Sequence, residues 1–135
     1  MSQNPRFTFT TDEAGNRLTV IDSTTGLEFT ARPVTDEPVT HQGAIDACAN
    51  CRIGGHSDWA LTDRQQLLSL VDLSRYNPAI DTDAFPEFPA GWFWTADLCA
   101  WSSASAWNVN FNNGNVNNNH RNNNGFALAV RRAGQ

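Results

Sequence analysis

Three cysteines and three histidines are the residues of this sequence best suited to bind a metal or act in catalysis. Cys48 and Cys51 have the Cys-x-x-Cys spacing of zinc sites and redox pairs. The sequence has no second pair of this kind, so Cys99 and the histidines would have to complete a site. We therefore predict no metal and no cofactor. Buried free thiols are expected, or one disulfide from Cys99 to Cys48 or Cys51, because residues three apart on a helix lie near one face.

A hydrolytic site can also be assembled on paper, with Ser57 as nucleophile, His41 or His56 as base and Asp58 as the orienting acid. Ser57 and Asp58 follow two glycines, where a turn is expected. An Asp in a turn more often bonds backbone amides than reacts. We predict that the protein is not an enzyme.

The most unusual feature is a run of asparagines. Asn occupies eleven positions between residues 108 and 124 and only four positions in the rest of the chain. Each Asn amide both donates and accepts hydrogen bonds, so a face built from these side chains suits polar recognition. The alternative is a low-complexity tract that is disordered or prone to aggregation.

Apolar residues at strand spacing favour the first interpretation. Trp107, Val109 and Phe111 alternate with Asn, and Val116 continues the pattern beyond the Asn-Gly turn signal at 113–114. With the apolar side chains inward, the polar ones should point outward. The predicted ligand-binding residues are Asn108, Asn110, Asn112, Asn113, Asn115, Asn117, Asn118, Asn119, His120, Arg121, Asn122, Asn123 and Asn124.

The elements that would position this surface can be predicted from periodicity. Residues 1–34 should form N-terminal strands, with turns near residues 12–16 and 24–26. Residues 40–73 should hold two helices, the second beginning at Thr62 as N-cap with Gln65 three residues on. Residues 77–89 should form an irregular loop pinned by buried Ile80, Phe85 and Phe88. Residues 92–132 should form a C-terminal sheet, and the five tryptophans should mostly serve packing.

Composition limits the partners. A chain of 135 residues fits a single domain over 1–135, and its net charge of -5 disfavours nucleic acid and anionic membranes, which require basic patches. Every basic residue is Arg, which suggests a gene that avoids adenine-rich codons outside the Asn run. No signal-peptide or membrane-spanning stretch is apparent, so we expect a soluble protein, cytoplasmic or carried to a virion or cell surface by a partner.

Residues 54–72, Gly-Gly-His-Ser-Asp-Trp-Ala-Leu-Thr-Asp followed by a Leu-rich helix, resemble the Lcl C-terminal-type domain of bacteria and phages. Further matches are Pro78–Asp81, Phe93–Ala96, Trp101–Ser103 and Phe126–Arg132, and residues 22–27 resemble the family's opening strand. Ala60 departs from the usual Arg, and Asp63 from the usual Thr cap. The resemblance implies an α+β, C-type-lectin-like fold with two helices packed on small antiparallel sheets.

The stretch from Trp107 to Arg132 also resembles the variable region of proteins diversified by retroelements. There an error-prone reverse transcriptase misincorporates opposite template adenines, and Asn codons, AAC or AAT, can change widely without creating a stop. The resemblance implies a variable segment over residues 107–127 that binds a protein or glycan on a cell or virus surface, without calcium. The alternatives are a fixed carbohydrate-binding adhesin or structural surface module, and an enzyme related to the formylglycine-generating fold with a reactive cysteine pair.

Overall fold

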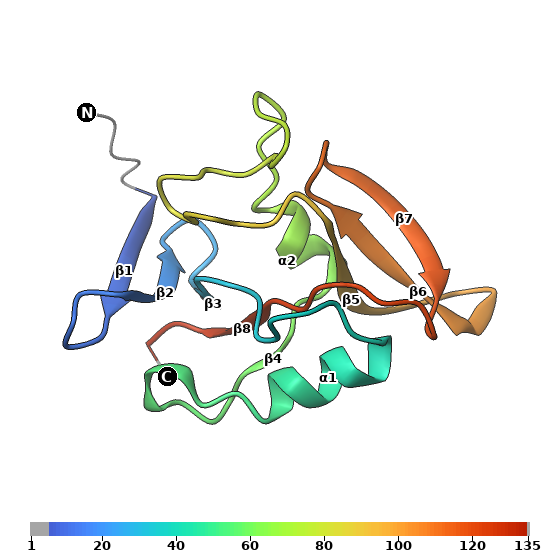
Figure 1. The fold of residues 1–135 in the computed structure, drawn as a ribbon, viewed down its shortest axis with the longest axis horizontal. Helices are drawn as coiled ribbons and strands as arrows, with labels where there is room; N and C mark the ends of the chain where they lie inside the picture. Colours follow the sequence, from blue (N-terminus) through green and yellow to red (C-terminus); the bar gives the residue numbers. More distant parts are fainter. Residues whose placement is uncertain (1–5, 135) are drawn as a thin grey trace.

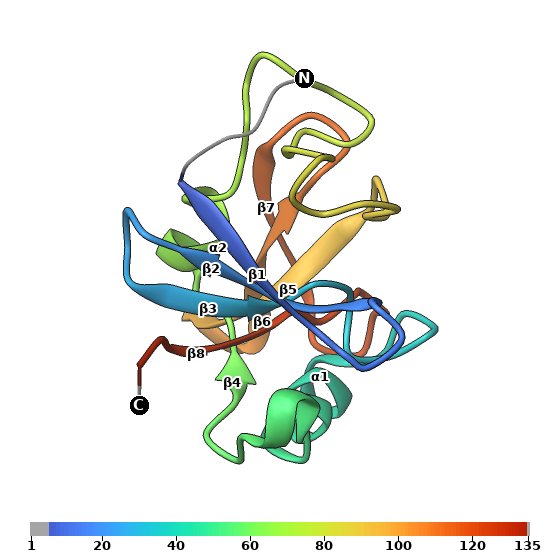
Figure 2. The same ribbon diagram turned by 90° about the vertical axis from the view of Figure 1, so that its left-hand side faces the viewer.

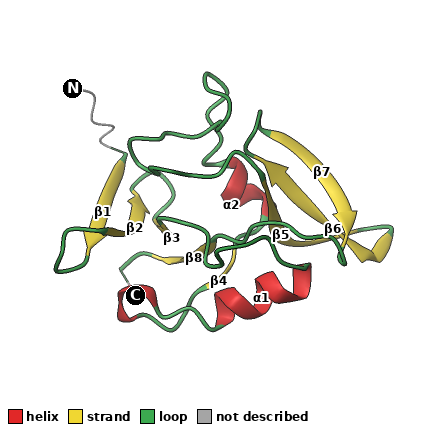
Figure 3. Ribbon diagram, in the orientation of Figure 1, coloured by secondary structure: helices red, strands yellow, loops and turns green. Residues whose placement is uncertain are grey.

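The computed structural model describes residues 6–134, which form two antiparallel sheets and two α-helices (Figures 1 and 3). The first sheet has five strands in the order β1-β2-β3-β8-β4, and the second has three in the order β5-β6-β7. The fold is therefore α+β, as expected. The first five residues of the predicted N-terminal strand region lie outside the described residues.

The N-terminal strands β1 (Phe7–Thr11), β2 (Arg17–Asp22) and β3 (Leu27–Thr30) form a meander. The turn between β1 and β2 uses Gly15 at φ 86°, a conformation that glycine adopts without a steric penalty. The C-terminal strand β8 (Ala129–Arg132) pairs with β3 on one side and with the short β4 (Ala60–Leu61) on the other. The N-terminal strands and the C-terminal strand therefore belong to the same sheet.

Both predicted helices are present but shorter than their apolar patterns. Helix α1 (His41–Ala49) is capped by Thr40, whose side chain accepts from the Gly43 amide. Helix α2 (Arg64–Leu68) begins one residue later than predicted: Asp63, with Gln66, forms the capping box. Thr62 cannot cap, because its backbone bonds to Leu128 and Ala96 on both sides. The backbone bonds of Thr62, directly after β4, thus fix where the helix starts.

Two apolar clusters fill the interior. The larger one contains residues of both sheets and Ile80, Phe85 and Phe88 from the irregular loop, all buried as predicted. The smaller cluster lies against α1 and includes Trp59, Trp94 and the three small residues Ala106, Ala127 and Ala129, among others. Figure 2 shows α1 beside the lower end of the molecule and the three-stranded sheet behind the N-terminal strands.

Candidate binding surface

The asparagine run lies on the three-stranded sheet. Strand β5 (Trp92–Cys99) pairs with β6 (Ser102–Asn110), which pairs with β7 (Asn115–His120). Residues 111–114 form the turn between β6 and β7, with Gly114 at φ 89°. Figure 1 shows β7 on the outside of this sheet. The prediction that the run forms strands with apolar residues in the core is confirmed for Val109 and Phe111, which are fully buried.

Most of the predicted ligand-binding residues are accessible. They lie at the end of β6, in the β6–β7 turn, on β7 and in the loop that follows β7. The exposed residues are Asn112, Asn113, Asn115, Asn117, Asn118, His120, Asn122, Asn123 and Asn124, and the half-buried ones are Asn110, Asn119 and Arg121. We call these twelve residues the Asn surface.

Asn108 is the exception, and its predicted outward orientation is wrong. Its residue surface is 1% exposed, and its side-chain oxygen and nitrogen have no hydrogen-bond partner among the described residues. Asn108 lies opposite Trp94 on β5, and Trp94 and Ala106 pack in the cluster around α1. Both faces of β6 are therefore covered at its centre, so strict alternation of inside and outside fails there.

Replacing Asn108 should stabilise the fold. A buried amide that makes no hydrogen bond keeps its desolvation cost, so Asn108→Val is expected to raise the free energy of unfolding by about 1 kcal/mol. Its cross-strand partner Asn117 is exposed, and Asn117→Val is the matched control, expected to change little. Urea unfolding of both variants measures the difference. A loss of stability in Asn108→Val would show that the amide makes a favourable interaction.

A buried histidine holds one end of the Asn surface. The Arg121 Nε donates to His41 Nδ1 at 2.8 Å, and His41 Nε2 lies 2.8 Å from the Thr95 carbonyl oxygen. Because a carbonyl only accepts, Nε2 carries the ring proton and Nδ1 is the acceptor, so the ring is neutral. Burial lowers the pKa of His41, the Thr95 bond opposes this, and the Arg121 charge lowers it further. The ring also packs edge-on against Trp94.

This histidine predicts a pH dependence of stability. Its pKa is lowered on folding from the ordinary value near 6.5, so the unfolded chain binds a proton that the folded chain excludes. The stability contributed is fully present above about pH 6.5 and is lost as the pH falls toward the folded-state pKa. Denaturant unfolding at about pH 7.5 and 5.5 should show a larger loss in the native chain than in His41→Gln. Equal losses would exclude His41 as the source.

The other end of the Asn surface is held by the irregular loop, which in the structure extends over residues 69–91, between α2 and β5. The backbone N–H of Asn77 donates to the Asn112 carbonyl at 2.8 Å, and that of Ala79 donates to the Phe111 carbonyl at 2.7 Å. Gly114 packs so closely on this loop that a Cβ there would lie 2.8 Å from Val71 Cγ1. The β6–β7 turn is thus fixed in place by backbone contacts as well as by its own sequence.

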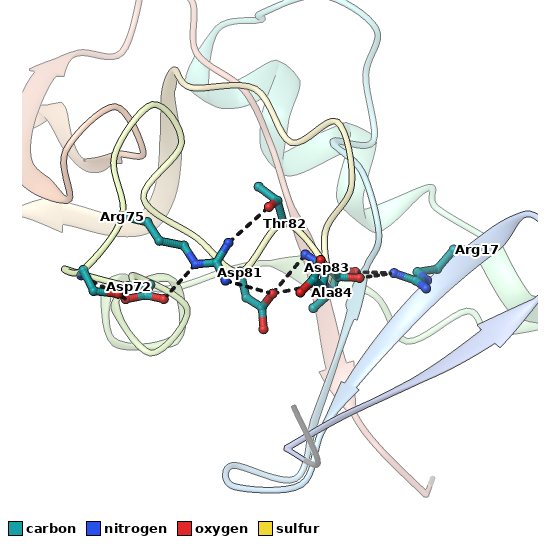
Figure 4. A network of polar contacts seen from close by, with 8 residues as sticks. Arg17, Asp72, Arg75, Asp81, Thr82, Asp83 and Ala84 are labelled. Atoms are coloured by element: carbon teal, nitrogen blue, oxygen red, sulfur yellow. Dashed lines mark hydrogen bonds and ion pairs between the residues drawn. The ribbon is translucent and has the colours of Figure 1, made fainter. Parts of the chain in front are cut away.

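Polar contacts make this loop rigid in turn. Figure 4 shows the Arg75 guanidinium between Asp72 and Asp81, with N–O distances of 3.2 and 3.8 Å, and beside Thr82. Arg17 of β2 donates to two carbonyls of the same loop, at residues 83 and 84. A loop without regular secondary structure is therefore tied to both sheets.

The structure places large apolar side chains at both ends of the Asn surface, which sequence reasoning missed. Leu73 and Tyr76 are 82% and 80% exposed on the loop that contacts the β6–β7 turn. At the β5–β6 turn Trp101 is 67% exposed and packs edge-on against Trp107, whose ring also lies 4.8 Å from the Arg64 guanidinium carbon. Single apolar residues in loops have no periodicity, so only the fold could show their exposure.

A known protein family matches most of this chain. The model of the Lcl C-terminal domain family matches residues 18–131, from β2 to β8. The chain belongs to the Lcl C-terminal domain family. No curated protein matches the chain. The match to the Lcl C-terminal domain covers the Asn surface and both elements that hold its ends.

Several residues considered for a metal or hydrolytic site make other contacts in this Lcl C-terminal domain. Cys48, Cys51 and Cys99 are buried free thiols, one of the two arrangements expected, and burial raises the pKa of Cys48 to about 12, with Cys51 adding to the shift. The Asp58 carboxylate accepts a hydrogen bond from the Arg131 guanidinium at 2.6 Å, and this contact lowers the pKa of Asp58. His41 accepts a hydrogen bond from Arg121. Within residues 6–134 no group of three metal-ligating side chains occurs.

Among the described residues of this Lcl C-terminal domain, no helix has the length and apolar character needed to cross a bilayer.

Proposed function

We propose that this protein is a ligand-binding protein with a C-type-lectin-like fold, and that the Asn surface is its variable binding site. The observation that carries the proposal is the separation of roles within one hairpin: Val109 and Phe111 are fully buried, whereas β7 and its flanking residues expose asparagines to solvent. A low-complexity tract without a structural role would not keep its apolar residues in register with the core.

Diversification by a retroelement accounts for the choice of asparagine. Asn codons carry two adenines, so adenine-directed errors can convert an Asn to many other residues without a stop codon. Eleven asparagines in this segment, in a protein without a single Lys, are the composition expected of a segment near its template state. We propose that mutagenesis of this kind changes the Asn surface, while the buried residues of the same hairpin are retained by selection on folding.

The physical logic is that of a rigid framework carrying variable contacts. Both ends of the surface are tied down, by His41 at one end and by the backbone of Asn77 and Ala79 at the other. Rigidity lowers the ordering cost of binding. Asparagine itself is a weak anchor, so the exposed Leu73 and Tyr76 are suited to supply apolar contact that does not depend on diversification. The proposed partner is a protein or glycan on a cell or virus surface, and the proposed role is binding rather than catalysis.

Genomic context tests this proposal. A reverse transcriptase gene beside the coding sequence, and a near-copy of the segment encoding residues 107–127, are expected. Mismatches between the two copies should fall at adenines of the template. A locus without either feature would contradict the diversification proposal.

A second candidate is a fixed carbohydrate-binding module, favoured by one observation. Trp101 is 67% exposed beside Trp107, and flat aromatic rings beside polar side chains suit stacking on sugars. A glycan array tests the Trp101 site of this candidate: a fixed module should bind a defined sugar, and Trp101→Ala should abolish this binding. Retained glycan binding in Trp101→Ala would exclude this site.

A further inference from the structure

Strand β7 is an edge strand, and the register shows which of its backbone groups point away from the sheet. In antiparallel pairs, residues alternate between hydrogen-bonded and non-hydrogen-bonded positions. The Arg121 N–H donates to the Ala104 carbonyl at 2.9 Å, so the pair two steps on, Ala106 with Asn119, is also a bonded pair. Continuing along the strand, Asn117 and Asn115 bond to β6. The N–H and C=O groups of Val116, Asn118 and His120 therefore point outward.

The fold covers one edge of this sheet and leaves the other open. At the β5 edge, Trp94 N–H donates to the Phe126 carbonyl at 2.9 Å, and Phe126 N–H donates to the Trp92 carbonyl at 3.0 Å. At the β7 edge, the His120 carbonyl accepts from Asn123 N–H at 2.9 Å, which closes only the end of the strand. Within residues 6–134, no other segment forms a backbone hydrogen bond with Val116 or Asn118.

Strand β7 also lacks the features that usually protect an open edge. Proteins commonly place Lys, Pro, inward-pointing charges or bulges on such strands. The six residues of β7 include no Lys, Arg, Asp, Glu or Pro, and their pairing with β6 runs without a register shift from His120 to Asn115. The strand is therefore regular, free of carboxylate, Lys and Arg side chains, and open to pairing.

We infer that the β7 edge binds an extended segment of the ligand protein, which adds to the sheet as a fourth strand. This inference rests on the proposed function and names the ligand class for it. Main-chain hydrogen bonds are the same whatever side chains the strand carries, so they supply affinity that survives diversification. Side chains on the two faces of β7 then read the neighbouring residues of the bound segment. The main-chain hydrogen bonds of β7 would thus contribute the same binding free energy in every sequence variant of the strand.

The size of the edge favours a peptide segment over a second copy of the chain. Six residues of strand span about 20 Å. Contact along one strand of this length falls short of the roughly 1,200 Å² that stable protein interfaces bury. An extended peptide segment is commonly recognised through a sheet edge, with main-chain hydrogen bonds along a single strand. Pairing of β7 with β7 of a second copy is the competing outcome that the test must separate.

The first experiment uses random linear peptides of about ten residues, the upper end of common strand lengths, displayed and selected on the immobilised full chain. A selected peptide is then synthesised in three forms: unmodified, N-methylated at its odd-numbered residues, and N-methylated at its even-numbered residues. N-methylation keeps the side chains but removes backbone donors. The unmodified peptide should bind, and one of the two alternate N-methylated registers should bind at least about tenfold more weakly. Failure to select any peptide would overturn this inference and leave the genomic test of the proposed function standing.

Amide hydrogen exchange gives a readout that side-chain binding would not move. In the free chain, the amides of Val116 and Asn118 should exchange fast, and those of Asn117 and Asn119 slowly. Saturating peptide should slow exchange at Val116 and Asn118 by at least about tenfold. Peptide binding without slower exchange at Val116 and Asn118 would overturn the inference about the β7 edge. The proposal that the Asn surface binds the ligand would still stand. Protection that instead rises with chain concentration, without peptide, would identify a second copy as the occupant.

A proline variant tests the same point by mutation. Asn118→Pro removes an outward N–H but no bond to β6, and proline is tolerated where an edge-strand N–H faces solvent. Asn118→Ala is the matched control, because it removes the same side chain and keeps the N–H. Asn118→Pro should weaken binding of the unmodified peptide at least about tenfold more than Asn118→Ala does. Equal affinities of the two variants, both folded by circular dichroism, would overturn the inference, and the exchange experiment decides it if Asn118→Pro does not fold.

Discussion

Phe111→Ala is expected to lower the free energy of unfolding by about 3–5 kcal/mol, a large part of the stability of a domain of this size. The Phe111 ring is fully buried at the start of the β6–β7 turn. It packs edge-on against Phe88 and Phe93, with ring centroids 5.1 and 5.3 Å apart. Truncation would leave a cavity in the larger cluster that these two rings cannot fill. Guanidinium unfolding followed by tryptophan fluorescence measures the loss.

The next residue along the chain provides the control. Asn112 is exposed, and Asn112→Ala is expected to change the free energy of unfolding by no more than about 0.5 kcal/mol. If the surface varies while the scaffold is retained, Phe111→Ala must destabilise the fold much more than Asn112→Ala does. Similar losses in the two variants would show that the Asn surface contributes to folding and could not vary freely.

Arg131→Met is expected to lower the free energy of unfolding by about 3–5 kcal/mol, because it leaves a buried carboxylate without its charge partner. Arg131 on β8 is buried and bonds to Glu28 of β3 at 2.5 Å and to Asp58 at 2.6 Å. Glu28 is buried as well, and its other oxygen accepts from the Thr19 hydroxyl. Methionine would fill much of the volume but supply no donor.

Arg132→Met is the matched control for this prediction. Arg132 is the next residue of the same strand and is exposed, so its substitution should change stability by no more than about 0.5 kcal/mol. A loss in Arg131→Met as small as that in Arg132→Met would show that the buried ion pair between Arg131 and Glu28 does not stabilise the fold.

Local sequence patterns predicted most of the fold. Alternation gave the N-terminal meander, and apolar residues in a proline-containing stretch gave the pinned loop with Phe85 and Phe88 buried. Thr62 was mistaken for the cap of α2 because Thr and Asp are both good caps. The choice between them depends on the pairing of β4 with β8, which joins residues nearly seventy positions apart. Such long-range pairing cannot be read from a local pattern.

The sequence predicted most of the exposed residues of the candidate surface, but the predicted exposure of Asn108 was wrong. Periodicity assigns Asn108 to the outward face together with Asn110, because it assumes that one face of a strand is exposed along its whole length. Trp94 lies opposite Asn108, in the smaller cluster that also contains residues of α1, and this packing removes that exposure. The exposure of Leu73 and Tyr76 was not predicted, because residues in an irregular loop follow no periodic pattern of burial.

The most direct test of a variable surface on a fixed scaffold is deep sequencing of the 3′ end of the gene across a natural population. The codons for Asn112, Asn113, Asn115, Asn117 and Asn118 are expected to vary at their adenines. The codons for Val109 and Phe111 should stay constant, and Asn108, whose codon also carries adenines, should accept small apolar residues but exclude charged ones, because its side chain is buried. Codons for the exposed asparagines that vary no more than those for Val109 and Phe111 would contradict the account.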